Sequence, residues 1–133
     1  MDLDISEIIS PASDDKRSEH RRYLIKWKLV MSAQLNGVDR TFYGWIGEVS
    51  MDEATAYIEN NLPVRIQLAA VFAIPPKIPH VAPKTIQVKC KSTYCVLNGN
   101  GMFRVGLQFA SFTGNGHDEL AKELADHIPL NAR

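Results

Sequence analysis

The stretch from Ile25 to Gly37, IKWKLVMSAQLNG, decides the fold class. From Ile25 to Leu35 every second side chain is apolar, and the side chains between them include two lysines, a serine and a glutamine. A period of two predicts a long strand with one buried face. Asn36-Gly37 then predicts a tight hairpin turn, because both central positions of such a turn need positive φ.

The residues after this hairpin predict more strands joined by short turns. A second strand, rich in aromatic and β-branched residues, is expected to end at Ser50, and we assign its Trp45 to core packing together with Trp27. Residues 64–74 are strongly apolar, and four prolines mark residues 75–83 as a loop. Residues 85–97 alternate again, with one face assigned to Ile86, Val88, Cys90, Tyr94 and Val96. After a turn at 98–101, the closing strand has one face made of Phe103, Val105, Leu107 and Phe109.

A single helix is predicted near the C-terminus, over residues ~116–128. Leu120, Leu124 and Ile128 recur at helical spacing, and Pro129 ends the pattern. Together these elements predict an antiparallel barrel or sandwich, with the helix covering an open end.

Residues 50–59 allow two interpretations. Ser50 and Glu53 satisfy the capping-box pattern of a helix N-terminus. In a strand, Ala54, Ala56 and Ile58 would alternate with more polar side chains. We favour the strand, because the neighbouring elements are all β.

Length and composition indicate the class of protein. The 133 residues fit one domain, and 45% hydrophobic and 23% charged residues are ordinary for a globular protein. The sequence lacks both a long apolar run and the core of a signal peptide, so we expect a cytoplasmic protein without membrane insertion. A net charge of zero argues against DNA or RNA as a partner.

No residue pattern in the sequence predicts catalysis, a cofactor or a metal site. The four histidines are scattered, and the sequence contains neither a nucleophile elbow nor a phosphate-binding glycine loop. Cys90 and Cys95 lie five apart in one predicted strand, so their side chains should point to opposite faces and stay reduced. We therefore expect a binding protein rather than an enzyme.

Charge is concentrated just before the first predicted strand. Residues 1–15 contain five acids and no Lys or Arg, which predicts a flexible acidic tail, whereas residues 16–28 contain six bases and one acid. Within the basic run, Arg17 and Arg21 are spaced as Arg-x-x-x-Arg, with Arg22 beside them. Guanidinium groups match phosphate oxygens with pairs of donors, and they stack on aromatic bases. The cluster is predicted to hold a negatively charged ligand.

A second motif follows the hairpin, and the two motifs together resemble the PilZ domain, a bacterial module that binds the second messenger cyclic di-GMP. The family pattern is Arg-x-x-x-Arg, a strand, Asp/Asn-x-Ser-x-x-Gly after a hairpin, a late strand with Gly-x-x-Phe, and a C-terminal helix. This chain has Arg17 and Arg21 in the first motif and Ser50 at the serine of the second. Gly106-Leu107-Gln108-Phe109 supplies the late strand, and the resemblance covers residues 16–128.

The resemblance implies a fold and a set of site residues. The family fold is a six-stranded antiparallel β-barrel with one C-terminal α-helix, which agrees with the all-β pattern. By resemblance, Arg17 and Arg21 contact the phosphates and guanines of cyclic di-GMP, with Arg22 as a helper. Glu48 and Ser50 occupy the positions that bond the guanine and the backbone. The family itself is not enzymatic.

Two positions depart from the family pattern. Glu48 stands where the family has Asp or Asn, and Glu53 stands where it has glycine. A glutamate in place of the glycine fills space beside the ligand and places a negative charge opposite a dianion.

Two hypotheses follow. In the first, residues 16–133 form a stand-alone PilZ-type receptor for cyclic di-GMP, which signals through an unidentified partner protein in motility, pilus or biofilm control. In the second, Glu53 marks a PilZ-like adaptor that has lost nucleotide binding and acts through protein–protein contacts. Residues 1–15 are a tail in both.

Overall fold

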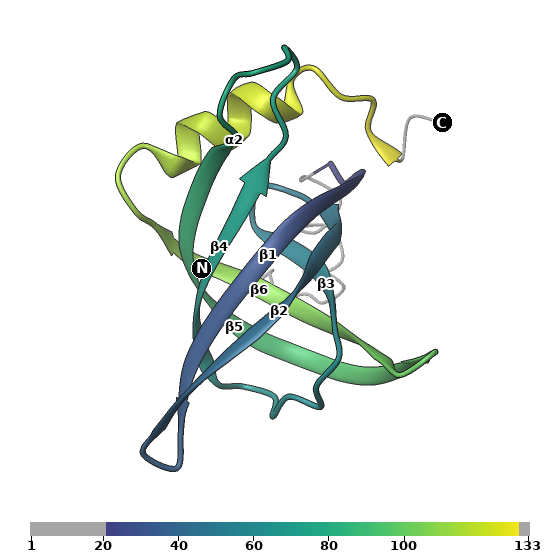
Figure 1. Cartoon of the computed structure of the whole chain (residues 1–133), viewed down its shortest axis with the longest axis vertical. Helices are drawn as coiled ribbons and strands as arrows, with labels where there is room; N and C mark the ends of the chain where they lie inside the picture. Colours follow the sequence, from purple (N-terminus) through teal and green to yellow (C-terminus); the bar gives the residue numbers. More distant parts are fainter. Residues whose placement is uncertain (1–20, 131–133) are drawn as a thin grey trace, which may run out of the picture.

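The computed structural model describes residues 21–130, which form six strands and one helix (Figure 1). The predicted tail, residues 1–15, and Arg17 lie outside the described residues. The elements are β1 (Tyr23–Leu35), β2 (Val38–Val49), β3 (Glu53–Ile58), β4 (Gln67–Ile74), β5 (Lys84–Gly99), β6 (Met102–Phe112) and α2 (Gly116–Leu124).

The six strands close into a barrel in the order β1-β2-β3-β6-β5-β4, and every neighbouring pair is antiparallel. β1 and β2 are joined at Asn36 and Gly37, whose φ values of 54° and 77° confirm the predicted turn. Asn100 and Gly101 join β5 and β6 in the same way, with φ of 54° and 75°. The all-β class and the six-stranded antiparallel barrel with one C-terminal helix are confirmed.

The barrel interior holds the apolar faces that the alternation predicted. Trp27, Leu29 and Met31 of β1 point inward and are buried, and Trp27 stacks on Phe72 with 5.8 Å between ring centroids. The other strands contribute Ile46, Ile58, Ile86, Val88, Cys90, Val105 and Leu107. Both cysteines are free thiols, as expected. Their predicted placement on opposite faces was wrong, because the pairing of β5 with β6 shifts between them and Cys95, like Cys90, packs against the core. Burial raises the pKa of the Cys90 thiol to about 12.

The ambiguous segment 50–59 contains a strand, as favoured. β3 pairs with β2 on one side and with β6 on the other, and its Ala54, Ala56 and Ile58 are buried. The amide of Glu53 does donate to the hydroxyl of Ser50, at 3.2 Å. That bond closes the turn between β2 and β3, however, and no helix begins there.

Trp45 lies on the outer face of the barrel, so its assignment to the core was wrong. Trp27 pairs with Ile46 across β1 and β2, and both are buried, which leaves the adjacent Trp45 on the opposite face. There its ring stacks on Tyr57, with 5.5 Å between centroids, and Lys26 Nζ lies 4.9 Å from the ring centre.

The alternation of β5 breaks after Ser92. Ser92 is buried, but the pairing with β6 shifts between Ser92 and Tyr94. Tyr94 and Val96, both assigned to the inner face, are instead 38% and 42% exposed. Such an irregularity inserts a residue into the ladder and moves the following side chains to the other face, which a strict period of two does not anticipate.

The helix α2 packs near the end of the barrel where β4 ends and β5 begins (Figure 1). Its Leu120 and Leu124 are buried, as predicted, but it ends at Leu124 rather than near Ile128. The amides of Asp126 and His127 bond to carbonyls three residues back, so the chain tightens into a turn and leaves Ile128 exposed. Within residues 21–130, no helix has the length and apolar character that crossing a membrane would require.

Candidate functional site

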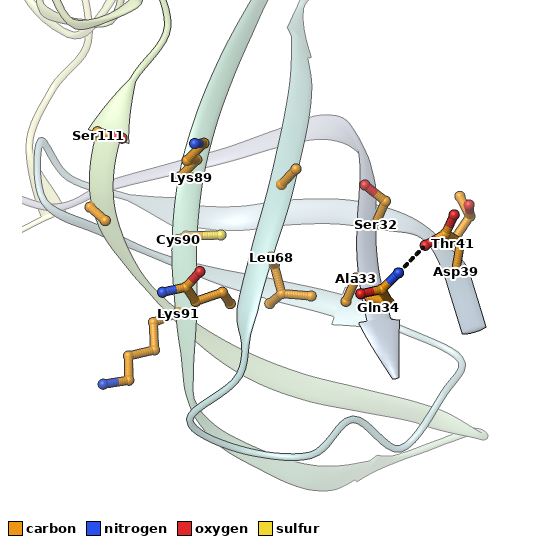
Figure 2. Close-up of a pocket in the computed structure, with 13 residues that line it drawn as sticks. Ser32, Ala33, Gln34, Asp39, Thr41, Leu68, Lys89, Cys90, Lys91 and Ser111 are labelled. Atoms are coloured by element: carbon orange, nitrogen blue, oxygen red, sulfur yellow. Dashed lines mark hydrogen bonds between the residues drawn. The ribbon is translucent and has the colours of Figure 1, made fainter. Parts of the chain in front are cut away.

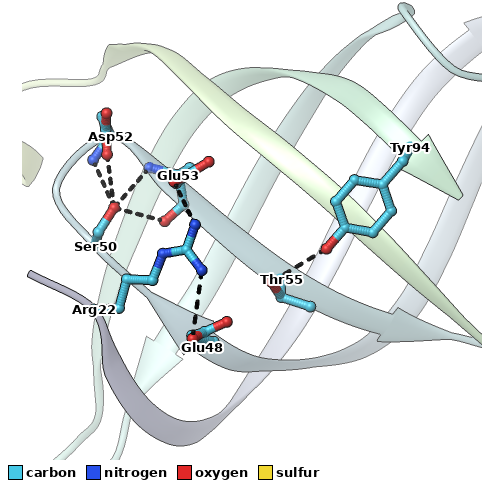
Figure 3. A network of polar contacts seen from close by, with 7 residues as sticks. All are labelled: Arg22, Glu48, Ser50, Asp52, Glu53, Thr55 and Tyr94. Atoms are coloured by element: carbon cyan, nitrogen blue, oxygen red, sulfur yellow. Dashed lines mark hydrogen bonds and ion pairs between the residues drawn. The ribbon is translucent and has the colours of Figure 1, made fainter. Parts of the chain in front are cut away.

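Arg22 lies immediately before β1 and contacts two carboxylates. Its carbonyl accepts a hydrogen bond from the amide of Leu130 at 2.5 Å, which ties the entry of β1 to the C-terminal segment. Its guanidinium lies 3.2 Å from Glu53 Oε2 and 3.8 Å from Glu48 Oε2 (Figure 3). All three side chains are partly exposed, so water screens these ion pairs.

The pairing of β2 with β3 brings the two glutamates to one face. Glu48, near the end of β2, pairs with Thr55 of β3 after an irregularity that follows Ile46. Glu53 lies two residues before Thr55 on the same strand, so its side chain shares that outer face. One arginine can therefore reach both carboxylates.

Ser50 shapes the turn that presents Glu53. Its hydroxyl donates to the Asp52 carboxylate at 2.7 Å and accepts from the amides of Asp52 and Glu53 at 3.3 and 3.2 Å (Figure 3). The Ser50 amide donates to the Glu53 carbonyl at 2.8 Å. The side chain is buried and its hydroxyl is committed to the turn, so Ser50 fixes the backbone beside the two glutamates.

These residues line a surface cavity of about 500 Å³, a size typical of small-molecule sites. Arg22, Glu48, Ser50 and Glu53 form one part of its wall. Most of the remaining wall comes from β3, β5 and β6, through Thr55, Tyr57, Thr93, Tyr94, Arg104, Gly106 and Gln108.

The predicted arginines are not equally placed. Arg17 lies outside the described residues, and Arg21 is exposed and forms no ion pair with a carboxylate in residues 21–130. Among residues 21–130, Arg22, to which the resemblance gives only a helping role, is the arginine that contacts the second motif. In the same described range, no group of three or more His, Cys, Asp or Glu side chains is arranged to hold a metal ion.

Tyr94 and Arg104 were not predicted from the sequence, although both line the cavity. The Tyr94 hydroxyl lies 3.5 Å from Thr55 Oγ1, and the Arg104 guanidinium carbon lies 6.0 Å from the Tyr94 ring centre. The alternation had assigned Tyr94 to the inner face. Gly106 in the last strand was an available signal, because a glycine inside a strand often marks the close approach of another group.

A second cavity, of about 720 Å³, is lined by residues of β1, β2, β4, β5 and β6 and shares no residue with the first (Figure 2). Lys89 and Lys91 line it from one face of β5, and Gln34 donates to Asp39 at 3.5 Å on its other side. No predicted site residue lies in it. The cavity beside Arg22 is therefore the candidate site.

No protein-family model matches the sequence, and no curated protein is significantly similar to it. Several solved structures do share the fold. The inhibitor of motility MotI/DgrA from Bacillus subtilis superposes with a TM-score of 0.60 at 7% identity, covering 83% of this chain and 53% of its own. MrkH from K. pneumonia in its apo state gives 0.56 at 17% identity, over 84% of this chain and 50% of its own.

The complex of MrkH with c-di-GMP gives a TM-score of 0.52 at 15% identity, over 80% of this chain and 49% of its own. The chain thus spans about half the length of these three solved structures. MotI/DgrA and MrkH are PilZ-domain proteins. The closed six-stranded barrel, its C-terminal helix and these superpositions together show that this chain has the fold of the PilZ domain.

Proposed function

We propose that this chain is a receptor for cyclic di-GMP rather than an enzyme, and that it passes the signal to a partner protein. The observation that carries the proposal is the convergence of Arg22 with three positions of the second motif, Glu48, Ser50 and Glu53, on one cavity of a PilZ-like barrel. MrkH, which shares the fold, has been solved in complex with c-di-GMP.

The chemistry of the cavity suits a ligand that combines anionic phosphates with hydrogen-bonding bases. Arg22 already binds carboxylate oxygens, and phosphate oxygens can replace them, because guanidinium groups bind both kinds of oxyanion with paired donors. Arg17 and Arg21 would add further phosphate contacts. Glu48 can accept from the N–H donors of guanine, while Ser50 holds the turn beneath it.

The proposal extends to the rest of the chain. Residues 16–133 act as the binding domain, and residues 1–15 act as an acidic tail outside it. Cyclic di-GMP binds Arg17, Arg21 and Arg22 at the edge of the barrel, and the altered surface is what a partner protein binds. The protein works in the cytoplasm, in bacterial motility, pilus or biofilm control, as the PilZ-like fold suggests.

A second candidate function is a PilZ-like adaptor without nucleotide binding. It is supported by the charges that line the cavity, where Arg22 and Arg104 are balanced by Glu48 and Glu53. A cavity without net charge attracts a dianion less strongly than an arginine cluster would.

Calorimetric titration of the full chain with cyclic di-GMP tests the proposal, with tryptophan fluorescence as a second signal. Trp45 stacks on Tyr57, which lines the cavity, whereas Trp27 lies in the core. We expect saturable binding, a fluorescence change that is lost in Trp45→Phe and kept in Trp27→Phe, and weaker binding in Arg22→Ala. Absence of binding at millimolar ligand would support the adaptor instead.

A further inference from the structure

Tyr94 lies flat across β6 because position 106 is glycine. Tyr94 and Gly106 are paired across β5 and β6. A Cβ atom at position 106 would come within 2.5 Å of Tyr94 Cδ2 and Thr93 Oγ1, so no larger residue fits under the ring. The ring therefore packs directly on the β6 backbone, while it remains 38% exposed and lines the cavity.

The ring is also held at its far end. Thr55 of β3 pairs with Gly106 from the side opposite to Tyr94, so the phenol crosses β6 and reaches Thr55. The two hydroxyl oxygens are 3.5 Å apart (Figure 3). A ring placed on a backbone and bonded at its tip has lost much of its freedom before any ligand arrives, which lowers the entropic cost of stacking on it.

Arg104 supplies a cation beside this ring. It lies two residues before Gly106, and its guanidinium carbon is 6.0 Å from the Tyr94 centroid. Among residues 21–130 it forms no ion pair with a carboxylate, whereas Arg22 contacts two. Arg104 is therefore the cavity arginine whose positive charge no described carboxylate pairs with, and it lies beside Tyr94.

We propose that Thr55, Tyr94 and Arg104 form a base-stacking subsite, which binds a purine ring of a phosphate-bearing ligand. The purine packs on Tyr94, and Arg104 contacts a phosphate or stacks on the exposed edge of the base. Thr55 keeps the ring in place. The inference rests on the proposed function, since both concern one cavity, and it adds a second wall to the one formed by Arg22 and Glu48. A ligand with two bases and two phosphates can use both walls.

Titrations of three variants test the subsite, with cyclic di-GMP and guanosine monophosphate as the probes. Tyr94→Leu removes the stacking ring and should weaken binding of both probes by about 5- to 100-fold. Tyr94→Phe keeps the ring and should lose about tenfold or less, because only one long hydrogen bond disappears. Tyr43→Leu is the matched control, because Tyr43 is 67% exposed on β2 and does not line the cavity; it should bind as the wild type does. Melting curves of all variants verify the fold.

The results separate this inference from the proposed receptor function. If the wild type binds cyclic di-GMP and Tyr94→Leu binds it equally well, the subsite is wrong and the receptor stands. If the wild type binds only guanosine monophosphate, and Tyr94→Leu abolishes that, the subsite stands and the receptor for cyclic di-GMP does not. If neither probe binds at millimolar concentration, both are wrong.

Discussion

The carboxylate of Glu53 lies 3.2 Å from the guanidinium of Arg22, which joins the residue before β1 to the first residue of β3. Arg22 also lies 3.8 Å from Glu48. The two positions that depart from the PilZ pattern thus contact the same arginine. A ligand phosphate that approaches Arg22 has to displace these carboxylates, and their negative charges oppose its arrival.

Glu53→Gly is expected to strengthen binding of cyclic di-GMP by about 5- to 100-fold, or about 1 to 3 kcal/mol. The substitution releases donors of Arg22, opens space in the cavity and removes a negative charge. Isothermal titration calorimetry gives the affinity. Because part of the gain is Coulombic, it should shrink as the salt concentration rises toward molar values.

Two further variants identify the cause of that gain. Glu53→Gln removes the charge and keeps the bulk, so it should show only the Coulombic part. Glu59→Gly changes an exposed glutamate just after β3 and should leave the affinity unchanged. Glycine inside a strand costs about 0.5 to 1 kcal/mol, so a small fall in the melting temperature of Glu53→Gly is expected. A fall in stability without any change in affinity, in both variants at position 53, would mean that Glu53 only supports the barrel.

Arg17→Ala and Arg21→Ala are each expected to weaken binding of cyclic di-GMP without unfolding the domain. Each guanidinium can make charge-assisted bonds to phosphate, and both residues precede the first strand, so the melting temperature should hardly move. Arg40→Ala is the control, because Arg40 is exposed near the first hairpin turn. Unchanged affinity in both variants would place the ligand elsewhere.

Leu120→Ala should destabilise the domain by about 2 to 5 kcal/mol, because Leu120 is fully buried where α2 meets the barrel. Lys122→Ala, on the exposed side of the same helix, should stay within about 0.5 kcal/mol of the wild type. Chemical denaturation measures both. Equal stability of the two variants would show that the helix is not part of the cooperative fold.

Cys90 should resist thiol reagents in the folded protein, whereas Cys95 should react. The pKa of Cys90 is raised from 9.0 to about 12 by burial, so its proton is held more tightly in the folded state than in the unfolded state. The buried, protonated thiol of Cys90 therefore contributes fully to the free energy of unfolding below pH 9. This contribution is lost as the pH rises toward 12.

A chromogenic disulfide reagent at pH 8 should accordingly report one reactive thiol in the native protein and two in denaturant. Cys95→Ser should leave no rapidly reacting thiol, which assigns the signal. Rapid reaction of this variant would contradict the burial of Cys90.

The sequence predicted the strands well, because local alternation and turn chemistry specify them. Both Asn-Gly turns and the inward face of β1 are where they were expected. Alternation predicted the wrong face of the barrel for Tyr94, because an irregularity in the pairing of β5 with β6 moves its side chain to the outer face. It could not settle Ser50 and Glu53 either, since the bond from the Glu53 amide to the serine hydroxyl is common to a helix cap and a strand turn. The pairing of β3 with β2 and β6 determines that this segment is a strand, and it joins residues that are distant in sequence.

The candidate site was likewise predicted from the sequence only in part. The motif positions Glu48, Ser50 and Glu53 were identified from spacing, and they do meet in one cavity. The contact of Arg22 with both glutamates depends on how the entry of β1 is tied to Leu130, which no local pattern contains. Tyr94 enters the cavity only through the irregularity in β5.

The closed order of the strands restricts how a partner protein can bind. A partner that joins a sheet by adding a strand needs a row of unpaired backbone N–H and C=O groups along an edge. Within the closed ring each of the six described strands has a neighbour on both sides, so such an edge remains only where a strand runs beyond its partner, as β2 does before Gly44 and β5 does after Ser92. A partner can therefore add a strand only at such extensions. Elsewhere it must recognise side chains on the outside of the wall, the loops or the helix. Along the closed part of the ring, the same closure protects the folded chain against edge-to-edge aggregation.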